Sequence, residues 1–293
     1  MNRVKVALCQ MKVTASKEEN LDKAVEMIAR ARQKDAEIVV LPEMFCCPLV
    51  HKYYQKYAER VPGGETVKIL SEAARREGVF LIGGSLPERV DEGAIYNTSL
   101  IFDNQGEQIG KCRKLHLFDV KLKNGFQFNE SATLSAGDQI TVIDTPWGKI
   151  GVLICYDLRF PELARLMALS GVKMIFAPAA FTKNTGQSHW ETLFKSRALD
   201  NLVFMLGCSP ARDPEAAYVV YGHSIAVNPW GKVIGELEEE EGMLIVDVQL
   251  DELDEARRSL PVWQHRREDV YYLSNLKALE NLTVFSSQSV KMD

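Results

Sequence analysis

The feature that most constrains the fold is an apolar run that ends at a cysteine and is followed by a helix signal. Residues 151–162 read Gly-Val-Leu-Ile-Cys-Tyr-Asp-Leu-Arg-Phe-Pro-Glu. The first part predicts a buried strand, and Pro161 is typical of a first helical turn, where a backbone N–H has no partner. Cys155 then lies at the carboxyl end of a strand and faces a helix N-terminus, whose partial positive charge favours a thiolate. We interpret Cys155 as a candidate nucleophile.

Two further predicted strands end at residues of complementary chemistry. Residues 37–41 are short and apolar, as in a strand buried on both faces, and Glu43 follows just after Pro42. Lys114 follows a predicted strand at 107–113. Taken singly, a cysteine, a glutamate and a lysine at these places are most simply a core residue, a loop acid and a surface cation. Three strand ends with complementary chemistry are hard to explain as a coincidence, and we predict that the three residues share one cleft.

The rest of the chain predicts a single α/β domain with mixed sheets. Strands are expected at 4–9, 37–41, 79–85, 95–103, 107–113, 140–145, 149–155, 173–178, 202–208, 221–228, 233–237 and 243–248. Helices are expected after Ser16, around 67–78, from Pro161, from the capping box at 188–191 to 200, and at 251–259. Residues 120–137 are polar and aperiodic, which predicts a functional loop.

Composition argues against several classes of function. The net charge of -5 and the lack of a basic cluster argue against nucleic-acid binding. No apolar run is long enough to span a bilayer, and the run at 4–9 is too short for a signal peptide, so we expect a cytoplasmic protein that does not bind membranes. The cysteines and histidines show no metal-ligand spacing, and glycine-rich nucleotide motifs are missing from the sequence, so we expect neither a metal nor an organic cofactor.

Three ordered motifs resemble those of the nitrilase, or carbon–nitrogen hydrolase, superfamily. They are Leu-Pro-Glu at 41–43, Lys-Cys-Arg-Lys-Leu-His-Leu at 111–117 and Val-Leu-Ile-Cys-Tyr-Asp-Leu-Arg-Phe-Pro-Glu at 152–162. The resemblance implies a four-layer α-β-β-α sandwich formed by residues 1–273, with a C-terminal tail at 274–293. It also implies a catalytic triad of Glu43, Lys114 and Cys155, and a homodimer or higher homo-oligomer packed through its helices.

Within that superfamily the chain most resembles the omega-amidase branch. The supporting stretches lie at 114–119, 128–131, 209–213 and 221–224. Members of this branch hydrolyse the terminal amide of short dicarboxylic monoamides such as alpha-ketoglutaramate and alpha-ketosuccinamate, and the resemblance implies that Glu130 is a second active-site glutamate. One alternative is another hydrolase of the superfamily, namely a carbamoyl-amine hydrolase, a peptide-like amidase or a nitrilase. A second alternative is an inactive sandwich that serves as a binding scaffold.

The expected mechanism proceeds through a thioester. Lys114 and the helix N-terminus favour the Cys155 thiolate, which attacks the amide carbon. Lys114 and the backbone N–H of Tyr156 hold the oxyanion. Glu43 gives a proton to the departing ammonia and then takes one from the water that hydrolyses the thioester. Glu130 orients Lys114 or the substrate amide.

A second set of residues is expected to bind the substrate: Tyr156, Arg159, Phe181 and Thr182. Arg159 follows the nucleophile closely and is a candidate for binding the distant carboxylate of a dicarboxylic monoamide. The alternative is that Arg159 pairs with Asp157 or Glu162 and braces the turn. The phenylalanine and the threonine follow the predicted strand at 173–178 and are expected to line the pocket wall.

Overall fold

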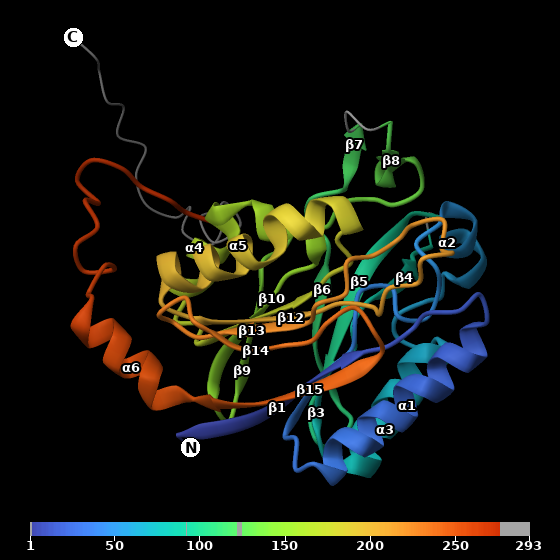
Figure 1. Cartoon of the computed structure of the whole chain (residues 1–293), viewed down its shortest axis with the longest axis horizontal. Coiled ribbons are helices and arrows are strands. Elements are labelled where there is room, and N and C mark those ends of the chain that lie inside the picture. The colour runs from blue at the N-terminus through green and yellow to red at the C-terminus, as the bar shows by residue number, and fades with distance from the viewer. Residues whose placement is uncertain (1, 92, 122–124, 276–293) are drawn as a thin grey trace.

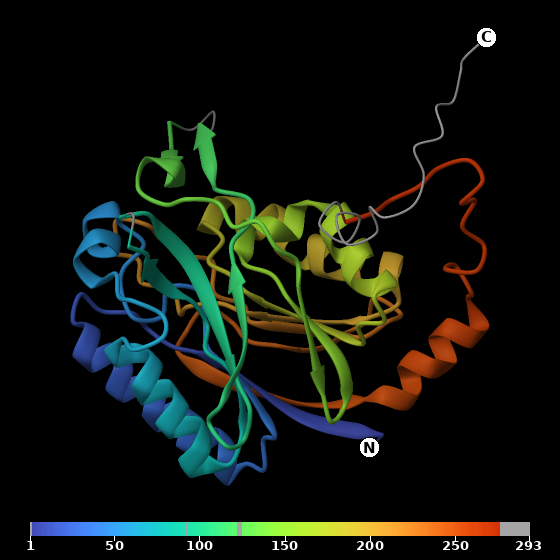
Figure 2. The same cartoon turned by 180° about the vertical axis from the view of Figure 1, so that it is seen from behind.

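The computed structural model of the chain describes residues 2–91, 93–121 and 125–275. Most of the described strands form two sheets that pack face to face. Helices α1 (Lys17–Gln33) and α3 (Glu65–Glu77) cover the outer face of one sheet, and α4 (Pro161–Leu169) and α5 (Lys183–Asn201) cover the outer face of the other (Figures 1 and 2). The structure confirms the predicted four-layer α-β-β-α sandwich.

Each sheet mixes parallel and antiparallel strand pairs. In spatial order, the first contains β15 (Gly242–Gln249), β1 (Arg3–Gln10), β2 (Ile38–Val40), β3 (Phe80–Ile82), β5 (Ile95–Phe102) and β4 (Leu86–Arg89), and β6 (Gln108–Arg113) also pairs with β5. The second contains β14 (Val233–Glu236), β13 (Ile225–Val227), β12 (Phe204–Cys208), β11 (Met174–Pro178), β10 (Gly148–Val152) and β9 (Thr141–Thr145). Other elements are α2 (His51–Tyr57), α6 (Leu250–Ser259) and the hairpin of β7 (Asp119–Lys121) and β8 (Gln127–Asn129).

Strand β1 shows why the first sheet is apolar on both faces. Val6 and Leu8 belong to a buried cluster that also contains Phe176 of β11 in the facing sheet. Ala7 and Cys9 belong to a second buried cluster, together with side chains of α1 and α3. Successive side chains of a strand point to opposite faces, so a central strand in this sandwich is apolar at nearly every position.

Two helix boundaries follow the capping signals of the sequence. The Ser16 hydroxyl accepts the N–H of Glu19 at 3.3 Å, and α1 begins at the next residue, Lys17. Helix α3 is followed by Gly78, whose φ is +64°. Glycine adopts this left-handed conformation without the steric cost of a Cβ, which confirms the predicted stop.

The structure differs from the prediction in several elements. Helix α5 begins at Lys183 rather than after Ser188, because the side chain of Thr182 caps it by accepting the N–H of Thr185. Helix α2 and strand β4 are additional to the predicted elements; in α2 only Tyr54 is buried, so the segment has no apolar periodicity. The segment 120–137 contains the β7–β8 hairpin, whose strands pair with each other and not with either main sheet.

The C-terminal part of the chain leaves the sandwich after α6 and runs up its side toward α4 (Figure 1). From residue 276 onward, the predicted tail at 274–293 lies outside the described residues. Within the described part of the chain, no helix is both long enough and apolar enough to cross a membrane.

Candidate active site

Glu43, Lys114 and Cys155 line one cavity, although they are far apart in the sequence. Glu43 follows β2 and Lys114 follows β6 in the first sheet, whereas Cys155 follows β10 in the second. The side chains are buried, with residue exposures of 2%, 2% and 5%. The same cavity is also lined by Leu49, Tyr54, Phe118, Phe128, Glu130, Ala180 and Tyr218. The structure therefore brings the three reactive groups together at one edge of the sandwich.

The backbone is strained beside two of these groups. Cys155 has a φ of +49°, and Met44, which directly follows Glu43, has a φ of +50°. A left-handed conformation costs a residue with a Cβ about 1–2 kcal/mol. Ser85 Oγ accepts the Met44 N–H at 2.9 Å and so helps to hold that turn. Strain of this kind is concentrated at sites where the direction of a side chain matters for function.

The Asp157 carboxylate joins the ends of β6 and β10. Its Oδ1 accepts the N–H of His116 at 2.8 Å, and its Oδ2 accepts the N–H groups of Leu115 at 3.4 Å and Ile154 at 3.1 Å. His116 Nδ1 also lies 2.8 Å from Asp157 Oδ1. These hydrogen bonds fix the segment that follows Lys114 against the turn that carries the cysteine. The sequence marks Asp157 only as a charged residue flanking that turn.

Lys114 lies between two carboxylates. Its Nζ is 3.0 Å from Glu43 Oε1 and 2.8 Å from Glu130 Oε2. Burial by itself would lower the pKa of the Lys114 ammonium, but the charges of Glu130 and Glu43 outweigh burial and raise this pKa well above its ordinary value. Lys114 is therefore a permanent cation in the cavity, available to stabilise negative charge.

Both glutamates are fixed by further hydrogen bonds. Glu43 Oε2 accepts the Ala180 N–H at 2.8 Å, and Glu43 Oε1 accepts an amide hydrogen from Asn97 Nδ2 at 2.8 Å. Glu130 Oε2 accepts the Phe118 N–H at 2.7 Å. Sequence analysis missed Asn97, because a single asparagine within a strand pattern carries no chemical signature.

The environment of Cys155 differs from the expected one. Burial, followed by the negative charge of Glu43, raises the pKa of the Cys155 thiol well above its ordinary value, and this outweighs the opposite effects of Lys114 and of a hydrogen bond from the Ala180 backbone. The expectation of a resting thiolate is therefore wrong, since a desolvated sulfur beside a carboxylate retains its proton. The same carboxylate can be a base for the thiol, since Glu43 and Cys155 line one cavity and interact electrostatically.

Arg159 lines a second small cavity beside Cys155, which Tyr156 and Phe181 also line. The guanidinium Cζ lies 4.8 Å from the centre of the Phe181 ring, and Nη1 is 3.2 Å from His189 Nδ1. Among the described residues, Arg159 forms no ion pair with a carboxylate, so the alternative of a brace to Asp157 or Glu162 has no support in the geometry.

Thr182 does not line the cavity that Tyr156, Arg159 and Phe181 line. Its hydroxyl is 2.8 Å from the hydroxyl of Thr185, and its side chain caps α5. Thr185, one turn later, is the threonine that lines the cavity beside Cys155. Because the helix begins before the predicted position, the register of this segment relative to the pocket could not be read from the sequence.

Aromatic side chains cover the cavity. The Phe118 ring contacts the Tyr156 ring at a centroid distance of 5.1 Å, and the Phe128 ring contacts the Tyr218 ring at 5.3 Å. Phe128 belongs to the β7–β8 hairpin, which stands above the strand ends (Figures 1 and 2). The hairpin and its neighbours thus limit access of water to the sulfur.

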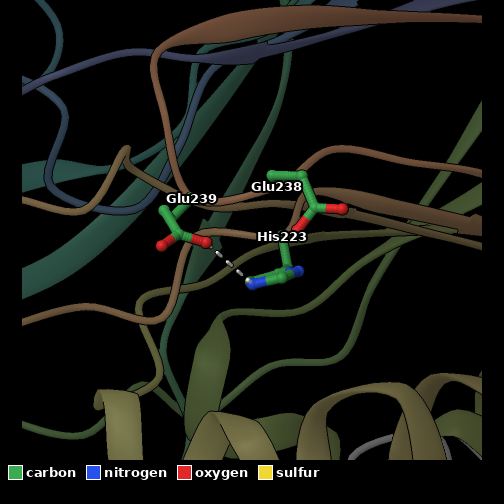
Figure 3. A group of neighbouring side chains, drawn as sticks. All are labelled: His223, Glu238 and Glu239. Atoms are coloured by element: carbon green, nitrogen blue, oxygen red, sulfur yellow. Dashed lines mark ion pairs between the residues drawn. The ribbon is translucent and has the colours of Figure 1, made fainter.

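Among the described residues, one group has the donor atoms and spacing of a metal site: His223, Glu238 and Glu239, with one possible ligand atom of each within 4.8 Å of the others (Figure 3). Two of its members already have protein partners. Arg212 Nη1 lies 2.9 Å from Glu239 Oε1, and His223 Nδ1 lies 3.4 Å from Glu236 Oε1. The cavity around Cys155 is lined by other residues, so this group has no part in its geometry.

Comparison with known sequences gives a consistent family assignment. A protein-family model described as carbon-nitrogen hydrolase matches residues 5–258. The omega-amidase NIT2 of Xenopus tropicalis is 45% identical over 277 residues, which make up 94% of this chain and 100% of the relative.

Solved structures agree with this assignment. Nit3 of Saccharomyces cerevisiae, a member of branch 10 of the nitrilase superfamily, matches with a TM-score of 0.84 and 40% identity, over 91% of this chain and 97% of that one. A mutant of the amidase from Nesterenkonia sp. AN1 matches with a TM-score of 0.74 and 27% identity, over 88% of this chain and 98% of that one. The Nesterenkonia structure shows the result of Michael addition of acrylamide at its active-site cysteine.

Proposed function

The chain belongs to the carbon–nitrogen hydrolase family, and from this premise we propose that it is an omega-amidase-like enzyme that hydrolyses the terminal amide of small carboxylate-bearing amides. Membership makes it a hydrolase of C–N bonds other than peptide bonds. The observation that carries the proposal is the contact of Lys114 Nζ with Glu43 and Glu130 in the cavity that also holds Cys155.

The first half-reaction forms a thioester and releases ammonia. The Cys155 sulfur attacks the amide carbon while Glu43 takes the thiol proton, which is the transfer that the raised pKa of the thiol requires. The carbonyl oxygen becomes an oxyanion, which Lys114 and the backbone N–H of Tyr156 stabilise. The C–N bond then breaks, and the nitrogen leaves as ammonia with the proton that Glu43 returns.

The second half-reaction hydrolyses the thioester. Glu43 is again a carboxylate, and it takes a proton from a water molecule as the water oxygen attacks the acyl carbon. The C–S bond breaks, the sulfur regains the proton from Glu43, and the carboxylic acid product leaves. In this scheme Glu130 does not exchange protons. It keeps Lys114 charged and directed toward the oxyanion position, as the 2.8 Å contact supports.

Arg159 is the residue that we propose for the distant carboxylate of the substrate. It lies beside the cavity of Cys155, and its hydrogen bond to His189 leaves the guanidinium with donors to spare. Tyr156, Phe181 and Thr185 provide the wall around the short chain that separates the amide from that carboxylate.

Two further proposals concern the oligomeric state of the protein and its cellular compartment. We propose a homodimer or higher homo-oligomer packed through the helical face. Two exposed apolar side chains support this, since Leu199 of α5 is 46% exposed and Trp230 is 47% exposed. We propose the cytoplasm as its compartment, since all six cysteines are free thiols. Light scattering on the purified protein measures the first, and cell fractionation the second.

The test is an ammonia-release panel of short dicarboxylic monoamides, neutral amides of the same length, carbamoyl amines and nitriles. We expect the monoamides to give the highest kcat/KM, and Cys155→Ala to abolish release from every compound. A preference for carbamoyl amines or nitriles would keep the chemistry but replace the substrate. Full activity of Cys155→Ala would exclude the thioester scheme, and no turnover of any compound by the wild type would favour a binding scaffold.

A further inference from the structure

Asn97 is a polar residue in the middle of the first sheet. It lies on β5 between the paired strands β4 and β6, and it is 1% exposed. Its backbone carbonyl accepts the N–H of Lys114 at 2.8 Å. The main chain of Asn97 is therefore in register with the lysine of the proposed active site.

The side chain of Asn97 reaches both glutamates. Nδ2 lies 2.8 Å from Glu43 Oε1 and 3.5 Å from Glu130 Oε1. Within the described part of the chain, its Oδ1 is buried and has no hydrogen-bond partner. A buried acceptor without a partner costs free energy that an aliphatic side chain of the same size would avoid. The Asn97 amide therefore lowers the stability of the fold through its unpaired oxygen. Its contribution to the site is the pair of N–H donors on Nδ2, which face the two glutamates.

We propose that Asn97 is a positioning residue of the proposed amidase reaction, whose side-chain amide holds the Glu43 carboxylate in place to accept the Cys155 proton. The inference rests on the proposed function. Two carboxylates face one ammonium in this cavity, so one negative charge is in excess. A neutral donor stabilises the ionised form of Glu43 without adding a second cation that would compete with Lys114 for the oxyanion.

The separate effects of a substitution on kcat and on KM report this role. The titratable and charged groups that surround Glu43 are Lys114 at the end of β6, Glu130, Cys155, Tyr54 of α2 and Tyr218. Transfer of the thiol proton depends on the direction of the Glu43 carboxylate. Loss of the Asn97 hydrogen bond should therefore lower kcat more than it changes KM.

The experiment compares Asn97→Leu and Asn97→Asp with Thr98→Val. Thr98 is the next residue on the same strand, and its hydroxyl donates to Glu88 at 2.8 Å on the opposite face of the sheet. The leucine removes the donor at similar volume, and the aspartate replaces it with an acceptor. The measurements are kcat and KM for ammonia release at neutral pH, together with Tm.

We expect Asn97→Leu to lower kcat about 10- to 100-fold, as for loss of a hydrogen bond to a charged group, with a smaller change in KM. Asn97→Asp should lose more activity, and Thr98→Val should keep the wild-type kcat and KM. Wild-type kcat and KM in Asn97→Leu, or an equal loss of kcat in Thr98→Val, would overturn the inference. These two outcomes would leave the proposed function unaffected. The proposed function fails only if the wild type releases no ammonia or Cys155→Ala retains activity.

Discussion

Two clusters of charged side chains, each with a buried carboxylate, use the same pair of strands, β5 and β6, and face opposite sides of the sheet. In the first, Glu88 Oε2 receives the Thr98 hydroxyl at 2.8 Å and the Arg113 Nε at 2.7 Å, and Glu88 Oε1 lies 2.9 Å from Lys111 Nζ. The second is built from the adjacent residues, Asn97 and Lys114, which contact Glu43 and Glu130. Successive side chains of a strand point to opposite faces of the sheet. Neighbouring residues, such as Asn97 and Thr98, therefore belong to different clusters.

The two clusters differ in the sign of their charge imbalance. Two cations surround the one carboxylate of Glu88. Burial alone would raise the pKa of Glu88, but hydrogen bonds from Arg113, Lys111 and Thr98 lower it below its ordinary value. In the other cluster two carboxylates surround one ammonium, and a thiol lies beside them. The comparison teaches that burial of charge is common to both clusters, whereas an excess carboxylate next to a thiol distinguishes the proposed reaction site.

The largest expected effect separates Lys114 from its neighbour Arg113. Lys114→Ala removes the proposed oxyanion donor, and kcat should fall about 10²- to 10³-fold. Arg113→Ala removes one of two cations from Glu88, so the free energy of unfolding should fall by about 1–3 kcal/mol while kcat stays near the wild-type value. Steady-state kinetics and urea denaturation of both variants measure the two quantities. If the variant at 113 lost as much activity as that at 114, the division between the clusters would be wrong.

A second contrast removes one carboxylate from each cluster. Glu130→Gln should lower kcat about tenfold or more by loosening Lys114, with little change in stability. Glu88→Gln should keep kcat and lose stability. Because the pKa of Glu88 is lowered in the folded state, its contribution is complete above its ordinary value of 4.5 and is lost as the pH falls below it. Thermal melts across pH 3 to 7 (roughly both sides of a carboxyl pKa) should show this loss in the wild type and less of it in Glu88→Gln.

A third prediction concerns two arginines in different settings. Arg113 is committed to Glu88, whereas Arg159 contacts His189 beside the cavity. Arg159→Met should raise KM for a dicarboxylic monoamide about tenfold relative to its effect on a neutral amide of the same length. Equal changes for both compounds would show that Arg159 only supports the turn.

The smallest expected effect is on the reactivity of the sulfur. Glu43 contributes to the raised pKa of the Cys155 thiol, after burial. Alkylation of Cys155 by iodoacetamide should therefore still accelerate above the ordinary thiol pKa of 9.0. Removing the neighbouring charge in Glu43→Gln should move the profile to lower pH, and Glu88→Gln should leave it unchanged. Peptide mass spectrometry resolves Cys155 from the other cysteines, and an identical profile in Glu43→Gln would contradict this role of the carboxylate.

The strand ends of the site could be predicted from the sequence, because each has a local mark. An apolar run stops at Pro42 before Glu43, and another stops before Asp157 just after Cys155. The carboxyl ends of β2, β6 and β10 meet at one edge of the sandwich, so placing three residues at strand ends was enough to bring them near each other.

The other members of the site depend on contacts that no local pattern encodes. Asn97 meets Glu43 because of the register between β5 and the strands beside it, and Asp157 reaches the backbone of Leu115 across two sheets. Thr185 replaces Thr182 in the pocket because a cap fixes the start of α5. The protonated state of the thiol follows from burial by segments distant in sequence, which reverses the expectation from the nearby lysine and helix.

The most direct test of the account is the mass of the enzyme during turnover. The wild type is mixed with a short dicarboxylic monoamide, quenched in acid within a turnover, and its intact mass and tryptic peptides are compared with those of Cys155→Ala. The account predicts one added acyl group, located on the peptide that contains Cys155 and absent from the alanine variant. Turnover without that adduct, or an acyl group on another cysteine, would contradict the thioester at Cys155 on which the account depends.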